Sequence, residues 1–402
     1  MNTKLISSLI FFLVFILFSF AFLFIKDSSL FVDEEVHYLQ IRRFMNLDFR
    51  VFDILSVIPG YHYFLHLFGK VFGLSSISFF RLINLVIGFC SIFVFFLLAF
   101  KIYKGFGFVR GLQYTFFPIL FPFFFLIYTD VLSLLLVLLM FYFLLQKNYD
   151  IAGIFAILSF FVRQNNVLWM AFGLSFVYAE RIGTRIDFKG FFRSIRDCWT
   201  FILGFVISLI FFIWNKGFAL GNKMMNEGGI YFGNLFFALF LFFFLFLPLN
   251  IGNFLKIKEL VKRNKWIWFI ILVIFIFYLK FFIVNHPYNF INTDYFLRNN
   301  ILGYFLNGIV LKSLLFLPIA YSILSLCTIR FKRREFYLLY PFAIFSLLPL
   351  WLIEQRYYLI PFSFFILFKK EESGLIEKLT IWIYLIFSFL LFYFIGSGKF
   401  FL

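Results

Sequence analysis

Residues 5–25 read LISSLIFFLVFILFSFAFLFI and contain no charged side chain. An α-helix needs about 20 mainly apolar residues to cross the hydrocarbon core of a bilayer, so this stretch predicts a transmembrane helix. Further apolar stretches cover residues 82–100, 112–128, 131–145, 201–214, 231–249, 266–284, 301–329, 336–350 and 379–395. The shorter ones are expected to be tilted, broken or shielded by neighbouring helices. The pattern predicts an all-α, multi-pass membrane protein with about 11–13 spans.

The composition indicates a single membrane domain over residues 1–402. Hydrophobic residues make up 64% of the chain, Phe occurs 76 times, and the mean hydropathy is +1.00. This leaves no room for a separate soluble domain. Residues 5–25 resemble a signal peptide but are long and lack a small-residue cleavage site, so a retained anchor is expected. The three cysteines show no disulfide framework or metal-ligand spacing, and neither a metal nor another cofactor is expected.

Lys and Arg are unevenly distributed between alternate loops. If Lys4 lies in the cytoplasm, alternation of the spans places these loops on the same side: residues 101–110, 147–150, 180–197, 251–265, 330–335 and 369–378. Together with Lys4 they hold 22 Lys and Arg against 9 Asp and Glu, whereas the opposite side holds 12 basic and 10 acidic residues. This positive-inside pattern predicts that the basic loops are cytoplasmic. The net charge of +17 therefore reflects topology, and nucleic-acid binding loses its main support.

The long loop on the opposite side, residues 26–80, is predicted to carry two helices. Apolar and polar residues alternate at near-helical spacing over residues 34–44 and 59–72, which is typical of helices that lie on a membrane surface. Asp33 and Glu34 would stand at the N-terminus of the first helix. One interpretation is that Asp33 caps this helix and Glu34 complements its dipole. The other is that one of these carboxylates is a general base that deprotonates a sugar hydroxyl.

The remaining loops on this side carry polar residues close to the ends of apolar stretches, so their side chains are expected to converge near the membrane boundary. Asp130 and Arg163 end neighbouring hairpins, and a structural ion pair between them is the favoured interpretation. Lys280 and Lys312 lie inside apolar stretches, where an ammonium group is costly. Lys280 is near enough to the outer end to snorkel, so Lys312 is the better candidate for a functional group. His286, taken alone, is more often an interfacial histidine than a catalyst.

Short motifs on this side occur in an order that resembles a known enzyme family. They are Asp33-Glu34 with His37, Gln40, Asp53, Pro59 and Gly60; Tyr128-Thr129-Asp130; Arg163-Gln164-Asn165-Asn166; residues 215–229; His286-Pro287; and Glu354-Gln355-Arg356-Tyr357-Tyr358. Together they resemble the dolichyl-phosphate-glucose-dependent alpha-1,2-glucosyltransferases, which add the terminal glucose to the lipid-linked oligosaccharide used in N-glycosylation. Where that family has an Asp-Asn-Arg-His run after the histidine, this chain has Asn292, Thr293, Asp294 and Tyr295.

The resemblance implies a C-type glycosyltransferase (GT-C) fold with its active site on the non-cytoplasmic face. The membrane would be that of the endoplasmic reticulum in a eukaryote, or the plasma membrane in a bacterium. The expected partners are a polyprenyl-phosphate sugar donor such as dolichyl-phosphate glucose, a lipid-linked glycan acceptor, and the bilayer itself. A β-linked donor and an α-linked product require inversion, hence one base and no covalent intermediate.

The positions and charges of individual residues predict their roles in such a reaction. Asp33 is preferred to Glu34 as the base, because Glu34 begins the helical pattern. The donor phosphate is expected to bind to Lys312 and Arg356, with Arg163, Lys280, His286 and Arg298 as further candidates. The residues expected to contact the substrates are His37, Gln40, Asp53, Asp130, Gln164, Asn166, Asn222, Glu227, Asp294 and Glu354.

Two other functions are compatible with these features. A transporter of a lipid-linked sugar would account for the buried lysines and the many spans. Such transporters are typically built from inverted repeats with binding groups at the midplane, whereas the polar residues here concentrate on one face. A C-type transferase of another sugar, as in bacterial envelope glycan synthesis, would show the same motifs, because sugar identity depends on pocket shape.

Overall fold

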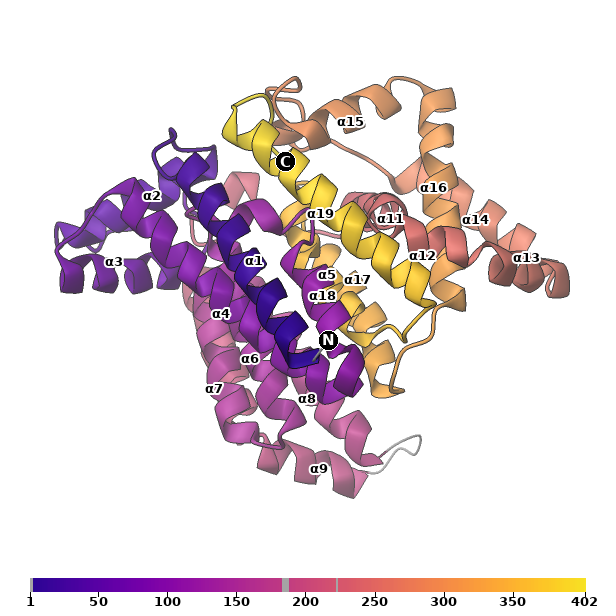
Figure 1. Cartoon of the computed structure of the whole chain (residues 1–402), viewed down its shortest axis with the longest axis horizontal. Helices are drawn as coiled ribbons and strands as arrows, with labels where there is room; N and C mark the ends of the chain where they lie inside the picture. Colours follow the sequence, from indigo (N-terminus) through magenta and orange to yellow (C-terminus); the bar gives the residue numbers. More distant parts are fainter. Residues whose placement is uncertain (1–2, 183–187, 222) are drawn as a thin grey trace.

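The computed structural model describes residues 3–182, 188–221 and 223–402 as helices joined by turns and loops (Figure 1). Within these residues the chain forms no β-strand, and its only ladder contacts are two isolated bridges, Phe296 with Phe401 and Phe331 with Lys369. The prediction of an all-α fold is therefore confirmed.

The helices of the first half are α1 (Thr3–Ile25), α2 (Asp33–Met45), α3 (Gly60–Phe72), α4 (Ile77–Tyr103), α5 (Gly107–Thr115), α6 (Thr129–Leu145), α7 (Tyr149–Val162), α8 (Val167–Ile182), α9 (Phe188–Asp197) and α10 (Trp199–Asn215). Those of the second half are α11 (Gly233–Leu245), α12 (Leu247–Gly252), α13 (Phe254–Arg263), α14 (Trp266–Phe281), α15 (Leu297–Leu306), α16 (Ile309–Thr328), α17 (Leu339–Leu347), α18 (Leu359–Phe368) and α19 (Gly374–Gly396). Short 3₁₀ segments are η1 (Lys104–Phe106), η2 (Phe121–Phe124), η3 (Gln164–Asn166), η4 (Lys223–Met225), η5 (Pro287–Asn289), η6 (Glu335–Leu338) and η7 (Gln355–Tyr358).

Apolar helices of several lengths could cross a membrane. Among the described residues, α4, α16 and α19 are each long and apolar enough to do so alone. α13 and α14 qualify together but are bent by 106° at their junction. Shorter apolar helices of 10–17 residues accompany them: Leu9–Ile25, Thr129–Leu145, Tyr149–Val162, Trp199–Asn215, Gly233–Leu245 and Glu335–Leu347. The arrangement is that of a multi-pass membrane protein.

Some apolar stretches that read as single spans are broken in the structure. Residues 112–128 leave the α-helix after Thr115 and continue as turns and 3₁₀ structure, since Pro118 and Pro122 lack an amide hydrogen and disfavour helical backbone before them. Pro248 stands at the start of α12, so residues 231–249 form two helices. Gly308, with φ of 117°, separates α15 from α16 within residues 301–329. Uninterrupted spans are consequently fewer than the apolar stretches suggested.

The core lies where α4, α6, η2 and α18 meet. α6 is buried along almost its whole length, so its 17 residues are enclosed by protein instead of lipid. Phenylalanine fills this core. Phe18, for example, contacts the rings of Phe121, Phe124 and Phe125 at centroid distances of 5.3–5.8 Å, which is the usual range for stabilising aromatic pairs.

The loops group at two ends of the molecule. Loops predicted to be cytoplasmic contact one another: Arg333 pairs with Glu180 at 3.4 Å, and Lys256 with Glu372 at 3.1 Å. In Figure 1, α9 lies at the lower edge, whereas α2, α15 and the C-terminus lie toward the upper edge. The contacts agree with the grouping that charge alone predicted. Which end faces the cytoplasm stays a prediction.

Residues 26–80, the long loop predicted to be non-cytoplasmic and called the first outer loop below, contain the two helices expected there. α2 and α3 cover residues 33–45 and 60–72, within a residue or two of the predicted bounds. They pack closely, because Gly69 has no side chain and a Cβ at that position would lie 2.9 Å from the sulfur of Met45. This contact joins the end of α2 to the last turns of α3.

Candidate active site

A cavity of about 320 Å³ opens where the loops predicted to be non-cytoplasmic converge. Its walls come from the start of α2, the segment 54–57, the starts of α6 and α15, and the loop before η7. Polar side chains lining it are Asp33, His37, Ser56, Thr129, Arg163, Asn226, His286, Tyr288, Arg298, Glu354, Arg356 and Tyr357. Most motifs that drew attention in the sequence therefore meet in one place.

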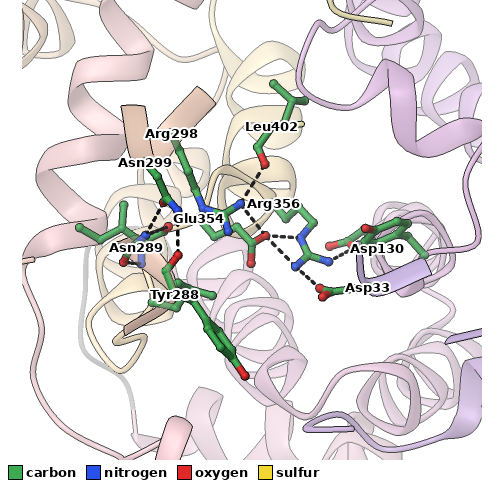
Figure 2. A network of polar contacts seen from close by, with 12 residues as sticks. Asp33, Asp130, Tyr288, Asn289, Arg298, Asn299, Glu354, Arg356 and Leu402 are labelled. Atoms are coloured by element: carbon green, nitrogen blue, oxygen red, sulfur yellow. Dashed lines mark hydrogen bonds and ion pairs between the residues drawn. The ribbon is translucent and has the colours of Figure 1, made fainter. Parts of the chain in front are cut away.

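Arg356 is the centre of the charge network beside this cavity (Figure 2). Its Nε donates to Glu354 Oε1 at 2.7 Å, and its Nη2 donates to Asp33 Oδ2 at 2.7 Å. Its Nη1 lies 3.9 Å from Asp130 Oδ2. A planar guanidinium can serve such divergent acceptors, whereas a lysine offers a single point charge. Arg356 was expected to bind phosphate, but its Nε and Nη2 donate to carboxylates, and it joins three segments far apart in the chain.

Two carboxylates line the cavity, Asp33 and Glu354, and Asp33 is the more exposed of the two. Its side chain is 46% exposed, although one oxygen is held by Arg356. Asp33 does not cap α2. The N-cap is Val32, with φ of 51° and ψ of −117° and no side-chain cap hydrogen bond. A β-branched residue at positive φ is a strained conformation that persists only where its surroundings impose it.

Glu34, the alternative base, is enclosed. Its side chain is fully buried and accepts hydrogen bonds from Arg81 Nε at 2.9 Å and Arg81 Nη2 at 2.7 Å. The backbone amides of Phe31 and Ile127 donate to the same carboxylate. Arg81 in turn donates to carbonyls of residues 25–29. Glu34 is not among the cavity-lining residues. Its buried ion pair with Arg81 fixes the position of the first outer loop, and this environment does not fit a general base.

Two further arginines face the cavity. Arg163 pairs with Asp130, as expected, and lies over the ring of Tyr357. Arg298 donates to Glu354 Oε1 at 3.2 Å and to the Leu402 carbonyl oxygen at 2.9 Å. The buried Arg298 Nε and Asp130 Oδ2 have no hydrogen-bond partner among the described residues. Arg298 lines the cavity, whereas Asp130 does not.

His37 lies one helical turn after Asp33 on α2 and forms a buried pair with His62. The distance between His37 Nδ1 and His62 Nε2 is 2.9 Å, so the two rings share one hydrogen bond. Burial, followed by the positive charges of Arg356 and Arg163, lowers the pKa of His37 to about 3. Burial also holds the pKa of His62 well below its ordinary value. A neutral His37 therefore faces the cavity at neutral pH.

His286 also lines the cavity, at the loop before α15. Its Nε2 lies 3.0 Å from the Met225 carbonyl, and its Nδ1 accepts from the Tyr288 amide at 3.1 Å. Burial lowers its pKa, although the Met225 carbonyl opposes this effect. Both ring nitrogens are occupied, so His286 orders the loop and is a weak candidate for phosphate binding.

Three residues expected to bind substrate instead hold backbone segments together. Gln40 bonds the Arg50 carbonyl and the Phe52 amide, and Asn166 donates to Ser133 Oγ and the Ser159 carbonyl. Gln164 accepts from the Ile58 amide and donates to the carbonyls of Ser56 and Phe218. Gln164 thereby shapes the cavity wall at residues 56–58, whereas Gln40 and Asn166 do not line it.

Several candidates lie away from the cavity. Asp53, Glu227 and Asp294 are exposed and do not line it, and Asn222 lies outside the described residues. Lys312 and Lys280, on α16 and α14, do not line it either. Lys312 Nζ donates to the Leu279 carbonyl at 2.9 Å, in the last turn of α14. Carbonyls at a helix C-terminus attract a cation, which explains this lysine without a phosphate.

Sequence reasoning missed a pair of asparagines that position Glu354. Asn234 Oδ1 accepts from the Glu354 amide at 3.2 Å and the Tyr358 hydroxyl at 2.8 Å. Asn289 exchanges two hydrogen bonds with Ile353, at 3.0 and 3.1 Å. Figure 2 shows Asn289 beside Asn299, which holds the same loop. The one available signal was a buried amide, Asn234, within an apolar stretch, because such groups require partners.

Comparison with known proteins agrees with the motifs. A Candida albicans protein named Dol-P-Glc:Glc(2)Man(9)GlcNAc(2)-PP-Dol alpha-1,2-glucosyltransferase is 25% identical over 279 residues, which cover 65% of this chain and 62% of that protein. The Drosophila melanogaster protein of that name is 24% identical over 410 residues, covering 91% and 90%. The Arabidopsis thaliana one is 24% identical over 344 residues, covering 66% and 67%. No solved structure matches the chain significantly.

These relatives carry the name of a transferase, which favours an enzyme over a transporter. The family model described as the DIE2/ALG10 family matches residues 27–190 and 181–367. This region contains every cavity-lining residue except Phe401. With most of its length matched, this chain belongs to the DIE2/ALG10 family.

Proposed function

We propose that this protein is an inverting alpha-1,2-glucosyltransferase that moves glucose from dolichyl-phosphate glucose to a lipid-linked oligosaccharide. The family membership and the names of the relatives support the donor, the acceptor and the linkage. The observation that carries the proposal is a half-exposed carboxylate, Asp33, in a cavity onto which three arginines converge. A base and a set of phosphate ligands are the two requirements of this reaction.

Asp33 is the general base in this mechanism. Its free oxygen takes the proton from the acceptor hydroxyl while the hydroxyl oxygen bonds to the anomeric carbon of glucose. The bond between that carbon and the phosphate oxygen breaks at the same time, and dolichyl phosphate leaves with the electron pair. General-base assistance contributes typically about 10²- to 10⁴-fold. Arg356 fixes the orientation of Asp33 through the 2.7 Å hydrogen bond.

Arg163 and Arg298 bind the leaving phosphate. Each lines the cavity and has guanidinium nitrogens that no carboxylate among the described residues occupies. Charge-assisted hydrogen bonds from arginine to phosphate are short and strong, and they gain strength as negative charge accumulates on the departing group. His37 and Tyr288 line the same space and contact the sugar hydroxyls.

We place the cavity on the luminal face of the endoplasmic reticulum membrane. The charge bias of the loops supports the side. The relatives named above come from a fungus, an insect and a plant, which supports the eukaryotic compartment over a bacterial plasma membrane. Impermeant thiol labelling of single cysteines at Asp294 and Lys258 in sealed microsomes tests it. Labelling is expected only at position 258, and labelling of 294 alone would reverse the topology.

The activity is tested with purified protein in liposomes. Radiolabelled dolichyl-phosphate glucose and dolichyl-phosphate mannose are supplied separately, with a lipid-linked oligosaccharide that carries two glucose residues as acceptor. Glucose transfer is expected, in an alpha-1,2 linkage that a linkage-specific glucosidase releases, and Asp33→Asn is the inactive control. Transfer of mannose instead, or of no sugar with folded protein, would contradict the proposal.

A further inference from the structure

A second and larger cavity lies between α11, α13, α16, α17 and α18, and we call it the lateral groove. Its volume is about 1260 Å³, and it shares no lining residue with the active-site cavity. Its walls are mostly apolar, with Leu239, Phe242, Ile323, Leu347 and Phe365 among them. Pockets for drug-sized ligands are typically about 300–1,000 Å³, so the lateral groove has room for a lipid.

One end of the lateral groove is charged. This mouth is formed by the loops predicted to be cytoplasmic, and most of its charges cancel in ion pairs: Lys256 with Glu372 at 3.1 Å, Arg263 with Glu259 at 3.5 Å, and Glu371 with the neighbouring Lys332 at 2.9 Å. An ion-paired carboxylate repels an incoming anion less than a free one does, so the unpaired side chains determine the preference of the mouth.

Arg330 and Lys370 are those unpaired side chains. Both line the mouth and are exposed, and neither has a side-chain partner among the described residues. The backbone holds them together. The Lys370 amide donates to the Arg330 carbonyl at 2.8 Å, next to the antiparallel bridge between Phe331 and Lys369. Two cations are thus fixed side by side at the end of an apolar groove, which complements a single phosphate above acyl chains.

α13 has the features of a helix that lies at the depth of lipid headgroups. It is bent by 106° from α14 and projects from the body of the molecule at the right of Figure 1. Its Phe254 and Leu255 are exposed, and basic residues, Lys258 and Lys262 among them, cover other positions. A basic amphipathic helix of this kind lies in the membrane interface. Because α13 contributes Leu260 and other residues to the groove, its mouth shares that depth.

We propose that the lateral groove binds one anionic glycerophospholipid from the cytoplasmic leaflet. Its phosphate lies between Arg330 and Lys370, and its acyl chains follow the apolar walls. Basic pockets between transmembrane helices on the cytoplasmic side are suited to anionic headgroups. The bound lipid also stabilises the position of Glu354 in the active site. Tyr358 lines the groove, and its hydroxyl donates to Asn234, which accepts from the Glu354 amide. The proposal does not rest on glucosyl transfer.

The test is lipid binding to the delipidated full chain in detergent, followed by native mass spectrometry and thermal unfolding. Phosphatidylserine is expected to bind tightly and raise the melting temperature, whereas phosphatidylcholine with the same acyl chains binds weakly. Each basic side chain near an anionic headgroup contributes about fivefold in affinity, so Arg330→Gln with Lys370→Gln weakens phosphatidylserine binding roughly 25-fold. The control pair Lys258→Gln with Lys262→Gln removes equal charge from α13 outside the groove and changes binding less than about threefold.

Two further variants keep the test decisive if the glutamine pair folds poorly. Arg330→Lys with Lys370→Arg preserves both charges and is expected to bind as the unmodified chain does. Ala343→Phe adds a ring to the groove wall on α17 and is expected to exclude the lipid while the basic mouth is intact. Equal binding of the two phospholipids, equal weakening by the groove and control pairs, or displacement of phospholipid by polyprenyl phosphate alone would overturn the proposal.

Discussion

The two ends of the molecule each carry an arginine–carboxylate network, and they differ in how completely the carboxylates are enclosed. One end carries the loops predicted to be cytoplasmic and is called the inner end, and the opposite end is called the outer end. At the inner end, Glu377 is 1% exposed. It accepts hydrogen bonds from Arg110 at 2.9 Å, Lys369 at 3.0 Å, Gln113 at 2.6 Å and a backbone amide. This network ties α5 to the start of α19 and leaves its carboxylate no room for a ligand.

At the outer end, the network around Arg356 is open on one side. Glu354 and Asp130 are nearly buried, but Asp33 is 46% exposed and borders the 320 Å³ cavity. The same residue types therefore support different roles. An enclosed carboxylate with every oxygen occupied stabilises the fold, whereas a carboxylate held by one oxygen and open at the other is available for chemistry.

The largest expected effect comes from breaking the inner network. Glu377→Gln leaves Arg110 and Lys369 buried without their counter-ion, and loss of one partner from a buried pair costs about 3–5 kcal/mol of stability. Thermal unfolding in detergent should show a large drop in melting temperature. Glucose transfer per folded molecule should be unchanged. Loss of transfer without loss of stability would mean that the inner network belongs to the active site.

Weakening the outer network should affect turnover more than stability. Arg356→Lys keeps the charge but cannot hold Glu354 and Asp33 together, so Asp33 moves from its position. Misplacement of a reacting group by about 1 Å costs about 10²-fold in rate, and we expect a loss of this size in initial rate at saturating donor. Arg50→Lys is the control, since the Arg50 side chain is 80% exposed and Asp48 is its one partner among the described residues. Equal rates for both variants would remove Arg356 from the mechanism.

The buried histidine pair should make stability depend on pH. Because the pKa of His37 is lowered to about 3 and that of His62 lies well below 6.5, both stay neutral in the folded chain where the unfolded chain takes up protons. The free energy of unfolding should therefore fall as pH falls below 6.5, with a limiting slope of about 1.4 kcal/mol per pH unit for each histidine. Denaturant titrations between pH 6.5 and 5 measure the slope. His37→Gln should remove the share of the slope that His37 contributes, and an unchanged slope would refute the assignment.

A smaller effect is expected at Val32, whose φ of 51° strains the backbone before Asp33. Glycine adopts this conformation freely, whereas a Cβ at positive φ costs about 1–2 kcal/mol. Val32→Gly should therefore be more stable than Val32→Ala by about 1 kcal/mol, the reverse of the usual order. Melting temperatures of the two variants decide this, and a more stable alanine variant would show that the strain is absent.

The sequence predicted the features that depend on pattern and charge. The spacing of apolar residues located α2 and α3. The distribution of Lys and Arg grouped the loops predicted to be cytoplasmic, and ion pairs join several of these loops to one another. The order of the motifs identified residues that meet at the cavity, including Asp33, Arg163 and Glu354. These features were accessible because each is local, or is a sum over many residues.

Features that depend on tertiary partners were not predictable. Glu34 and Asp33 are neighbours in the chain, and only the position of Arg81 on α4 shows that Glu34 is enclosed. Lys312 looked functional in an apolar stretch until the end of α14 supplied its acceptor. The clamp formed by Asn234 and Asn289 joins segments more than fifty residues apart, for which one sequence contains no pairing information.

Asp33→Asn tests the central claim most directly, because it removes the base while leaving a side chain that Arg356 can still contact. Melting temperature and glucose transfer from saturating dolichyl-phosphate glucose are measured on the same preparation, beside Glu34→Gln. We predict near-normal melting and a loss of about 10²- to 10⁴-fold in turnover for Asp33→Asn. Glu34→Gln should instead lose stability and retain turnover in the molecules that stay folded. Nearly full activity of folded Asp33→Asn would contradict the account.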